Sequence, residues 1–193
     1  MKQNTKKVVG LGLFTAIVVV LQLLGSVIKF GPFSVSLVLI PIVVGTAIYG
    51  VGAGAWLGLV FGVTVLASGD AAAFLTVNAI GTVITVLLKG TLAGTFAGLV
   101  YKALERFNKY LAVIAAAVVC PVMNTGVFLL GCQLFFLDTV KGWAAAAGMD
   151  NVGTYMIVGL VGLNFVFELV ANIVLGPVAV RIINIGKKEN KKV

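Results

Sequence analysis

The stretch TVNAIGTVITVLLKGTLAGTFAGLVYKAL, residues 76–104, decides the fold of this chain. Lys89 is its only charged residue before Lys102, near the end of the stretch. An α-helix rises about 1.5 Å per residue, so about 20 mostly apolar residues cross the hydrocarbon core of a bilayer. The stretch therefore predicts a transmembrane helix.

Similar apolar runs fill most of the remaining chain. With the first stretch included, we expect helices over residues 8–28, 35–50, 52–68, 76–104, 111–136 and 153–183. The segment between the last two carries Asp138, Lys141 and Asp150, so we expect it at the membrane surface. The predicted fold class is all-α integral membrane, a six-transmembrane-helix bundle that forms a single membrane domain over residues 1–193.

The overall composition supports this prediction. Hydrophobic residues make up 61% of the chain and charged residues 10%, and the mean hydropathy is +1.16. A soluble domain is about 45–50% apolar and about 25% charged. So few charges cannot cover a water-facing surface, so we expect a multi-pass protein of the bacterial cytoplasmic membrane.

The net charge of +8 is distributed unevenly along the chain. Most basic residues lie in three groups: Lys2, Lys6 and Lys7; Lys102, Arg106 and Lys109; and Lys187, Lys188, Lys191 and Lys192. An even number of helices places all three groups on one side of the membrane. Loops rich in Lys and Arg stay in the cytoplasm, so both termini are predicted to be cytoplasmic. Charges that flank apolar segments in this way argue against nucleic-acid binding.

Several classes of chemistry are absent from the sequence. The chain has no histidine, which excludes His-based acid–base catalysis and the usual zinc sites. It also lacks a Gly-rich phosphate loop that ends in Lys-Ser or Lys-Thr, so it is not expected to hydrolyse ATP by that route. We expect neither an enzyme nor a bound metal or cofactor.

Polar residues within the apolar runs are the candidates for a binding site. They are Lys89, Asn124, Asn164, Glu168 and Asn172, with Asn78 directly before the fourth helix. Ionisable groups at membrane depth are costly and normally face the bundle interior or a cavity. Two interpretations stay open: Lys89 and Glu168 pair while the asparagines join helices, or these residues line a polar ligand site. Apolar walls for such a site could come from Phe74, Phe128, Phe135 and Trp143, although lipid-facing or core positions are commoner for such residues.

Small residues recur at four-residue spacing on three predicted helices. The sets are Gly54, Gly58 and Gly62; Gly90, Gly94 and Gly98; and Gly12 with Ala16. Such spacing lets another helix approach the backbone closely. We expect the first two sets to pack within the chain, whereas Gly12 and Ala16 could instead contact another subunit.

The order of these features resembles one known family, the substrate-binding S components of energy-coupling factor (ECF) vitamin transporters. The resemblance rests on the following residues: Gly31-Pro32-Phe33-Ser34-Val35-Ser36-Leu37, Pro41, Tyr49-Gly50, Asn78, Lys89-Gly90, Ala93-Gly94, Pro121 and Asn124-Thr125. Pantothenate-type and related uncharacterised members are the most similar. Each motif is short, but the resemblance extends over nearly the whole chain, and its strength is the order of the motifs.

The resemblance implies a mechanism. An S component captures a micronutrient from outside and docks on a membrane coupling subunit that two cytoplasmic ATPases drive. Docking uses small residues of the first helix, which Gly12 and Ala16 match with one departure, a glycine in place of the usual alanine. Members of the pantothenate type often carry arginine where this chain has Lys89, and a cation there would suit a carboxylate ligand. Glu168 would instead suit an amine or a donor-rich ligand, so riboflavin and other vitamins stay open.

The residues themselves leave two other functions open. A small secondary transporter would work alone with an ion gradient, and a structural membrane subunit would bind no small molecule. The chain shows no convincing inverted repeat, which counts against the first alternative.

Overall fold

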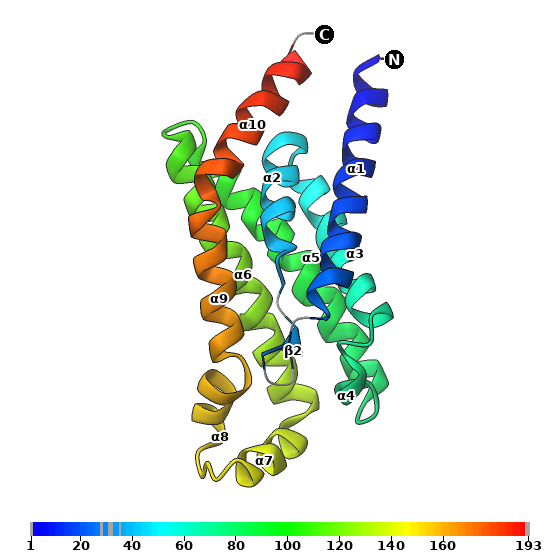
Figure 1. Cartoon of the computed structure of the whole chain (residues 1–193), viewed down its shortest axis with the longest axis vertical. Coiled ribbons are helices and arrows are strands. Elements are labelled where there is room, and N and C mark those ends of the chain that lie inside the picture. The colour runs from blue at the N-terminus through cyan, green and yellow to red at the C-terminus, as the bar shows by residue number, and fades with distance from the viewer. Residues whose placement is uncertain (1, 28, 31–32, 35, 192–193) are drawn as a thin grey trace.

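The computed structural model describes residues 2–27, 29–30, 33–34 and 36–191. Gly31, Pro32 and Val35, which contribute to the family resemblance, lie outside the described residues. The chain is almost entirely helical (Figure 1). Its elements are α1 (Lys2–Gly25), β1 (Lys29–Phe30), β2 (Phe33–Ser34), α2 (Leu39–Tyr49), α3 (Val51–Ala67), α4 (Ala72–Leu75), α5 (Ala79–Leu104), α6 (Lys109–Phe135), α7 (Leu137–Ala146), α8 (Val152–Thr154), η1 (Tyr155–Leu160), α9 (Gly162–Val174) and α10 (Gly176–Lys191).

Three described helices are long and apolar enough to cross a membrane. They are the Thr5–Gly25 part of α1, and α5 and α6 in full. A fourth crossing is possible if Val152–Leu160 and Gly162–Val174, which meet at an angle of 45°, form one span. The apolar helices α2 and α3 are shorter, with 11 and 17 residues. The all-α prediction is confirmed, with three to four candidate membrane spans by length and composition.

The helix expected over residues 153–183 is not continuous. A π-helix, η1, occupies Tyr155–Leu160, and the chain bends by 45° before α9 begins at Gly162. A second break separates α9 from α10 at Leu175. Pro177 follows this break and has no backbone N–H, so it cannot donate to the carbonyl of Ile173 one turn earlier. Proline and local π-helical geometry are both common causes of helix bends.

The first two expected helices also have different bounds. α1 begins at Lys2 and ends at Gly25, whereas we expected residues 8–28. α2 begins only at Leu39, because the chain ahead of it forms a short antiparallel hairpin in which Lys29 pairs with Ser34. Apolar composition alone does not distinguish this non-helical segment from the helix that follows it.

Glycines allow the backbones of α3 and α5 to approach each other closely, as the four-residue spacing predicted. A Cβ atom on Gly58 would meet the carbonyl oxygen of Gly90, and a Cβ on Gly90 would meet that of Gly58. One turn along, a Cβ on Gly62 would lie 2.8 Å from the carbonyl oxygen of Val86. Any side chain at these positions would force the two helices apart, so the glycines determine how closely α3 and α5 pack.

The small residues of α1 face outward. A Cβ on Gly12 would meet no other atom within 4 Å, and both Gly12 and Ala16 are exposed. α1 is held to α3 beside this face, where Trp56 Nε1 donates a hydrogen bond to Thr15 Oγ1 at 3.0 Å. The Gly12–Ala16 face is therefore uncovered in the described part of the chain.

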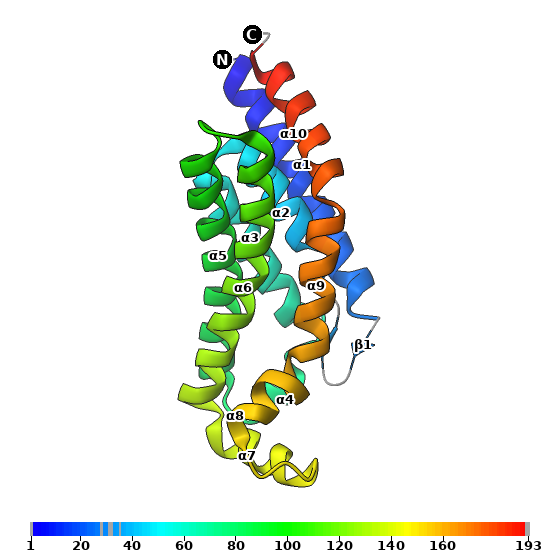
Figure 2. The same ribbon diagram turned by 90° about the vertical axis from the view of Figure 1, so that its left-hand side faces the viewer.

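Both ends of the described chain lie at the same end of the bundle (Figures 1 and 2). The short helices α4, α7 and α8 lie at the opposite end. The molecule therefore has one end formed by the start of α1 and the end of α10, and another formed by short surface helices and loops.

Candidate functional site

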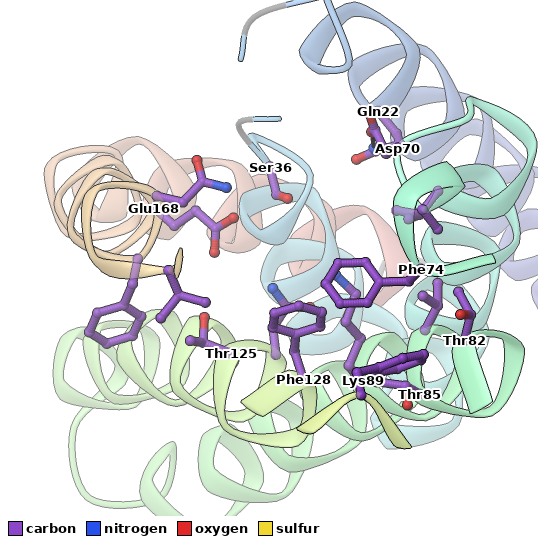
Figure 3. A pocket seen from close by; sticks show the side chains of 18 residues that line it. Gln22, Ser36, Asp70, Phe74, Thr82, Thr85, Lys89, Thr125, Phe128 and Glu168 are labelled. Carbon is purple, nitrogen blue, oxygen red and sulfur yellow. Dashed lines mark hydrogen bonds between the residues drawn. The ribbon is translucent and has the colours of Figure 1, made fainter. Parts of the chain in front are cut away.

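A pocket lies in the half of the bundle away from the termini. Its walls come from α1, the segment before α2, the region from α3 to α4, and helices α5, α6 and α9. The lining residues are Gln22, Ser36, Val65, Asp70, Ala71, Phe74, Thr82, Thr85, Val86, Lys89, Asn124, Thr125, Phe128, Phe136, Val161, Asn164, Phe165 and Glu168. Figure 3 shows their side chains converging from these separate elements.

The pocket is narrow for its extent. The empty space between its walls, its open side included, is about 720 Å³, but the centre of a water molecule can reach only about 60 Å³ of it. Small-molecule pockets commonly measure about 300–1,000 Å³. A ligand of vitamin size would therefore need the side chains of the walls to move apart.

Lys89 of α5 lies between two aromatic rings. Its Nζ is 5.5 Å from the ring centroid of Phe61 and 5.5 Å from that of Phe128. At this distance the negative face of each ring attracts the ammonium group. The ion pairs among the described residues are Lys141–Asp138 and Lys187–Glu105, so no carboxylate lies within 4.0 Å of Lys89. The ammonium group of Lys89 therefore lies between two rings at the wall of the pocket.

Glu168 of α9 lies opposite, with only 4% of its surface exposed. Ser36 and Asn124 are within hydrogen-bonding reach of its carboxylate, and the charge of Lys89 attracts it across the pocket. One turn later, Asn172 Nδ2 donates a hydrogen bond of 2.7 Å to the backbone oxygen of Glu168. This arrangement places a carboxyl group on one wall of the pocket and the amine of Lys89 on the wall opposite.

A hydrogen-bonded polar pair, Gln22 and Asp70, lines the side of the pocket formed by α1. Gln22 Nε2 donates a hydrogen bond of 2.6 Å to Asp70 Oδ2 and ties α1 to the loop after α3. Only 1% of the Gln22 side chain is exposed. In Figure 3 this pair lies across the pocket from Glu168.

Aromatic rings form the apolar part of the wall. Phe74 makes edge-on contacts with Phe128, Phe136 and Trp143, at centroid distances of 5.5, 4.9 and 5.4 Å. Phe74 and Phe128 line the pocket as the sequence suggested, while Trp143 packs behind Phe74. Phe135 is not a lining residue, because it packs against Gly81.

The structure brings together four of the six residues proposed for substrate binding: Lys89, Asn124, Asn164 and Glu168. Asn172 is buried behind the wall and bonds to the backbone of α9. Asn78 is outside the lining and caps α5, since its Oδ1 accepts a hydrogen bond of 2.9 Å from the backbone N–H of Gly81. An asparagine directly before a helix commonly has this capping role.

Sequence reasoning missed several polar lining residues. Thr82 and Thr85 precede Lys89 by seven and four positions on α5, so helical spacing places all three on one face. That spacing was a usable signal. Gln22 also stood out as a polar amide in the first apolar run, whereas Ser36 appeared only within the Gly31–Leu37 motif and was not proposed as a site residue.

The fold and the pocket define a class: a helical protein with apolar helices that suit a membrane and a buried pocket lined by polar side chains. The comparison with known families then identifies the chain. The model of the family described as ECF transporter, substrate-specific component, matches residues 6–183, and the chain belongs to this family. It is therefore the substrate-specific component of a transporter. No curated protein and no solved structure matches the chain.

Proposed function

We propose that this pocket captures a water-soluble micronutrient of vitamin size that carries a carboxylate, as pantothenate does. The observation that carries the proposal is the position of Lys89, whose amine lies between two rings with no carboxylate within 4.0 Å among the described residues. The ligand carboxylate would meet Lys89. Asn124, Asn164 and Glu168 would bind its polar remainder, while Phe74 and Phe128 would cover its apolar part.

Asn78 and Asn172 would support the site from outside its lining. Asn78 fixes the start of α5, the helix that carries Lys89. Asn172 bonds to the backbone of Glu168 and so stabilises the turn of α9 from which that carboxylate projects. Their proposed role in substrate binding is thus to position neighbouring groups.

We propose six membrane crossings with both termini in the cytoplasm. The position of both termini at one end supports an even number of crossings (Figure 1). α2, with 11 residues, would cross together with the non-helical segment before it, and the bent series α8–η1–α9 would form the last crossing. In this orientation the pocket lies in the outer half of the bundle, where an importer receives its substrate.

Delivery would require partners. The uncovered face of Gly12 and Ala16 would dock on a membrane coupling subunit, because small residues allow another helix to approach closely. Two cytoplasmic ATPases of the same ECF module would supply the energy.

Thermal stability in the presence of a vitamin panel tests the proposed function. A ligand present at about 1,000 times its dissociation constant adds about 4 kcal/mol to the free energy of unfolding. We expect one vitamin to raise the melting temperature of the purified chain in mild detergent. Lys89→Ala should abolish this shift, whereas Lys141→Ala, on the exposed surface of α7, should retain it. An unchanged affinity of Lys89→Ala would refute the assignment of Lys89.

A further inference from the structure

Two amide side chains in the pocket carry a buried oxygen without a hydrogen-bond partner among the described residues. Gln22 Nε2 donates to Asp70 at 2.6 Å. A carboxylate accepts but does not donate hydrogen bonds, so the nitrogen of the amide must face Asp70. The Gln22 carbonyl oxygen, Oε1, therefore faces away from Asp70. It is buried and has no hydrogen-bond partner among the described residues.

A second amide lies on the opposite wall. The Asn124 side chain is within reach of the Glu168 carboxyl group. Its oxygen, Oδ1, is buried without a hydrogen-bond partner in the described part of the chain, and only 5% of the Asn124 surface is exposed. Both Gln22 and Asn124 line the pocket.

Buried carbonyl oxygens without partners are rare in native proteins, since the lost hydration is not replaced. Two such oxygens in one pocket indicate that the missing hydrogen bonds come from whatever occupies it. Thr85 adds a third case, because its buried hydroxyl also lines the pocket and has no partner within the described residues. Unlike the amides, a hydroxyl can rotate to donate or accept.

We propose that Gln22 and Asn124 determine substrate specificity through two buried hydrogen-bond acceptors, the amide oxygens of their side chains. This inference rests on the proposed function of the pocket. The substrate is then a carboxylate that also carries hydroxyl or N–H donors at two separate places. One donor bonds to Gln22 Oε1 on the α1 side and another to Asn124 Oδ1 on the α6 side, while the carboxylate meets Lys89.

This proposal divides carboxylate vitamins into two groups. Pantothenate carries hydroxyl and amide N–H donors, and biotin carries ureido N–H donors. Lipoate and nicotinate have a carboxylate but no further donor. Biotin and lipoate are a matched pair, since both have a valerate tail and differ mainly in the ring. A site built to bond a donor rejects analogues that lack it, because its own buried acceptor is then left unpaired.

Isothermal titration of the purified full chain with these four compounds tests the proposal. We expect pantothenate or biotin to bind, and lipoate and nicotinate to bind at least about tenfold more weakly or not at all. Tight binding of lipoate or nicotinate would leave the proposed function standing and overturn this inference, since other molecules such as water would then satisfy the two oxygens. If no vitamin of any kind binds, the proposed function itself fails.

Two variants test the residues directly. Gln22→Met and Asn124→Leu replace an amide with an apolar side chain of similar size. Each should weaken binding of the donor-bearing vitamin by about ten- to a hundredfold. Asn108→Ser is the control, because it changes an amide outside the pocket, the cap of α6, while keeping a residue that caps helices. Unchanged affinity in both well-folded variants would contradict the proposal.

Discussion

The contact between α3 and α5 allows a quantitative prediction. A methyl group on Gly58 would overlap with both the carbonyl oxygen and the carbonyl carbon of Gly90, because it would lie much closer to them than van der Waals contact allows. Backbone atoms cannot rotate away as a flexible side chain can. Gly58→Ala must therefore separate the two helices or distort one of them.

Overpacking a well-packed interior typically costs about 1–3 kcal/mol. We expect the upper part of this range, because the obstructing atoms belong to the backbone. For a chain of this size, 1 kcal/mol shifts the melting temperature by about 2–4 °C. Gly58→Ala should therefore lower it by roughly 5–10 °C in a thermal melt in detergent.

The chain supplies a matched control for this measurement. A Cβ on Gly126, in the interior of α6, would meet no other atom within 4 Å. Alanine favours helix over glycine by up to about 1 kcal/mol, so Gly126→Ala should leave the melting temperature unchanged or raise it slightly. Equal melting temperatures for the two variants would refute the reasoning. Gly58→Ala should also weaken ligand binding, because Gly90 directly follows Lys89.

Three further predictions concern other regions of the chain. Gly12→Leu should leave vitamin binding intact but block uptake in cells that contain the ECF module, and uptake at the wild-type rate would reject the docking face. Asn78→Ala should lower the free energy of unfolding by about 1 kcal/mol through loss of the helix cap, and a melting temperature equal to that of the wild type would contradict this. Burial tends to lower the pKa of Lys187, but its hydrogen bonds to Glu105 and Tyr101 outweigh burial and raise the pKa above 10.5. A basic group whose pKa is raised on folding stabilises the folded state at every pH below its unfolded-state pKa. This stabilisation is lost as the pH rises through the folded-state pKa. The melting-temperature difference between wild type and Lys187→Met should thus stay constant from about pH 6 to pH 9 and shrink above about pH 10.5; a difference that shrinks below pH 9 would contradict this.

The sequence was sufficient for the helical membrane fold because long apolar runs have few alternatives in a bilayer. The glycine spacing of α3 and α5 was also informative, since small residues four positions apart share one helix face. The break at Leu175 was harder to predict from the sequence. Pro177 and the π-helix lie within an uninterrupted apolar run, so hydropathy alone does not separate α9 from α10.

The site was partly predictable for a related reason. Lys89 and Glu168 are conspicuous because ionisable residues are rare at membrane depth. Gln22 and Ser36 reach the pocket through the tertiary arrangement of α1 and the segment before α2, which sequence spacing does not specify. Asn78, in contrast, was predicted to bind substrate, but its side chain accepts a hydrogen bond from the backbone of the helix that follows it.

Native mass spectrometry tests the central claim most directly, namely that the pocket between α5, α6 and α9 captures a water-soluble micronutrient. The protein would be extracted in mild detergent and measured alone, then with the vitamin panel in excess. We expect a mass increase that corresponds to one vitamin per chain and that disappears in Lys89→Ala. A wild-type protein that retains no vitamin under either condition, and is stabilised by none, would contradict the claim.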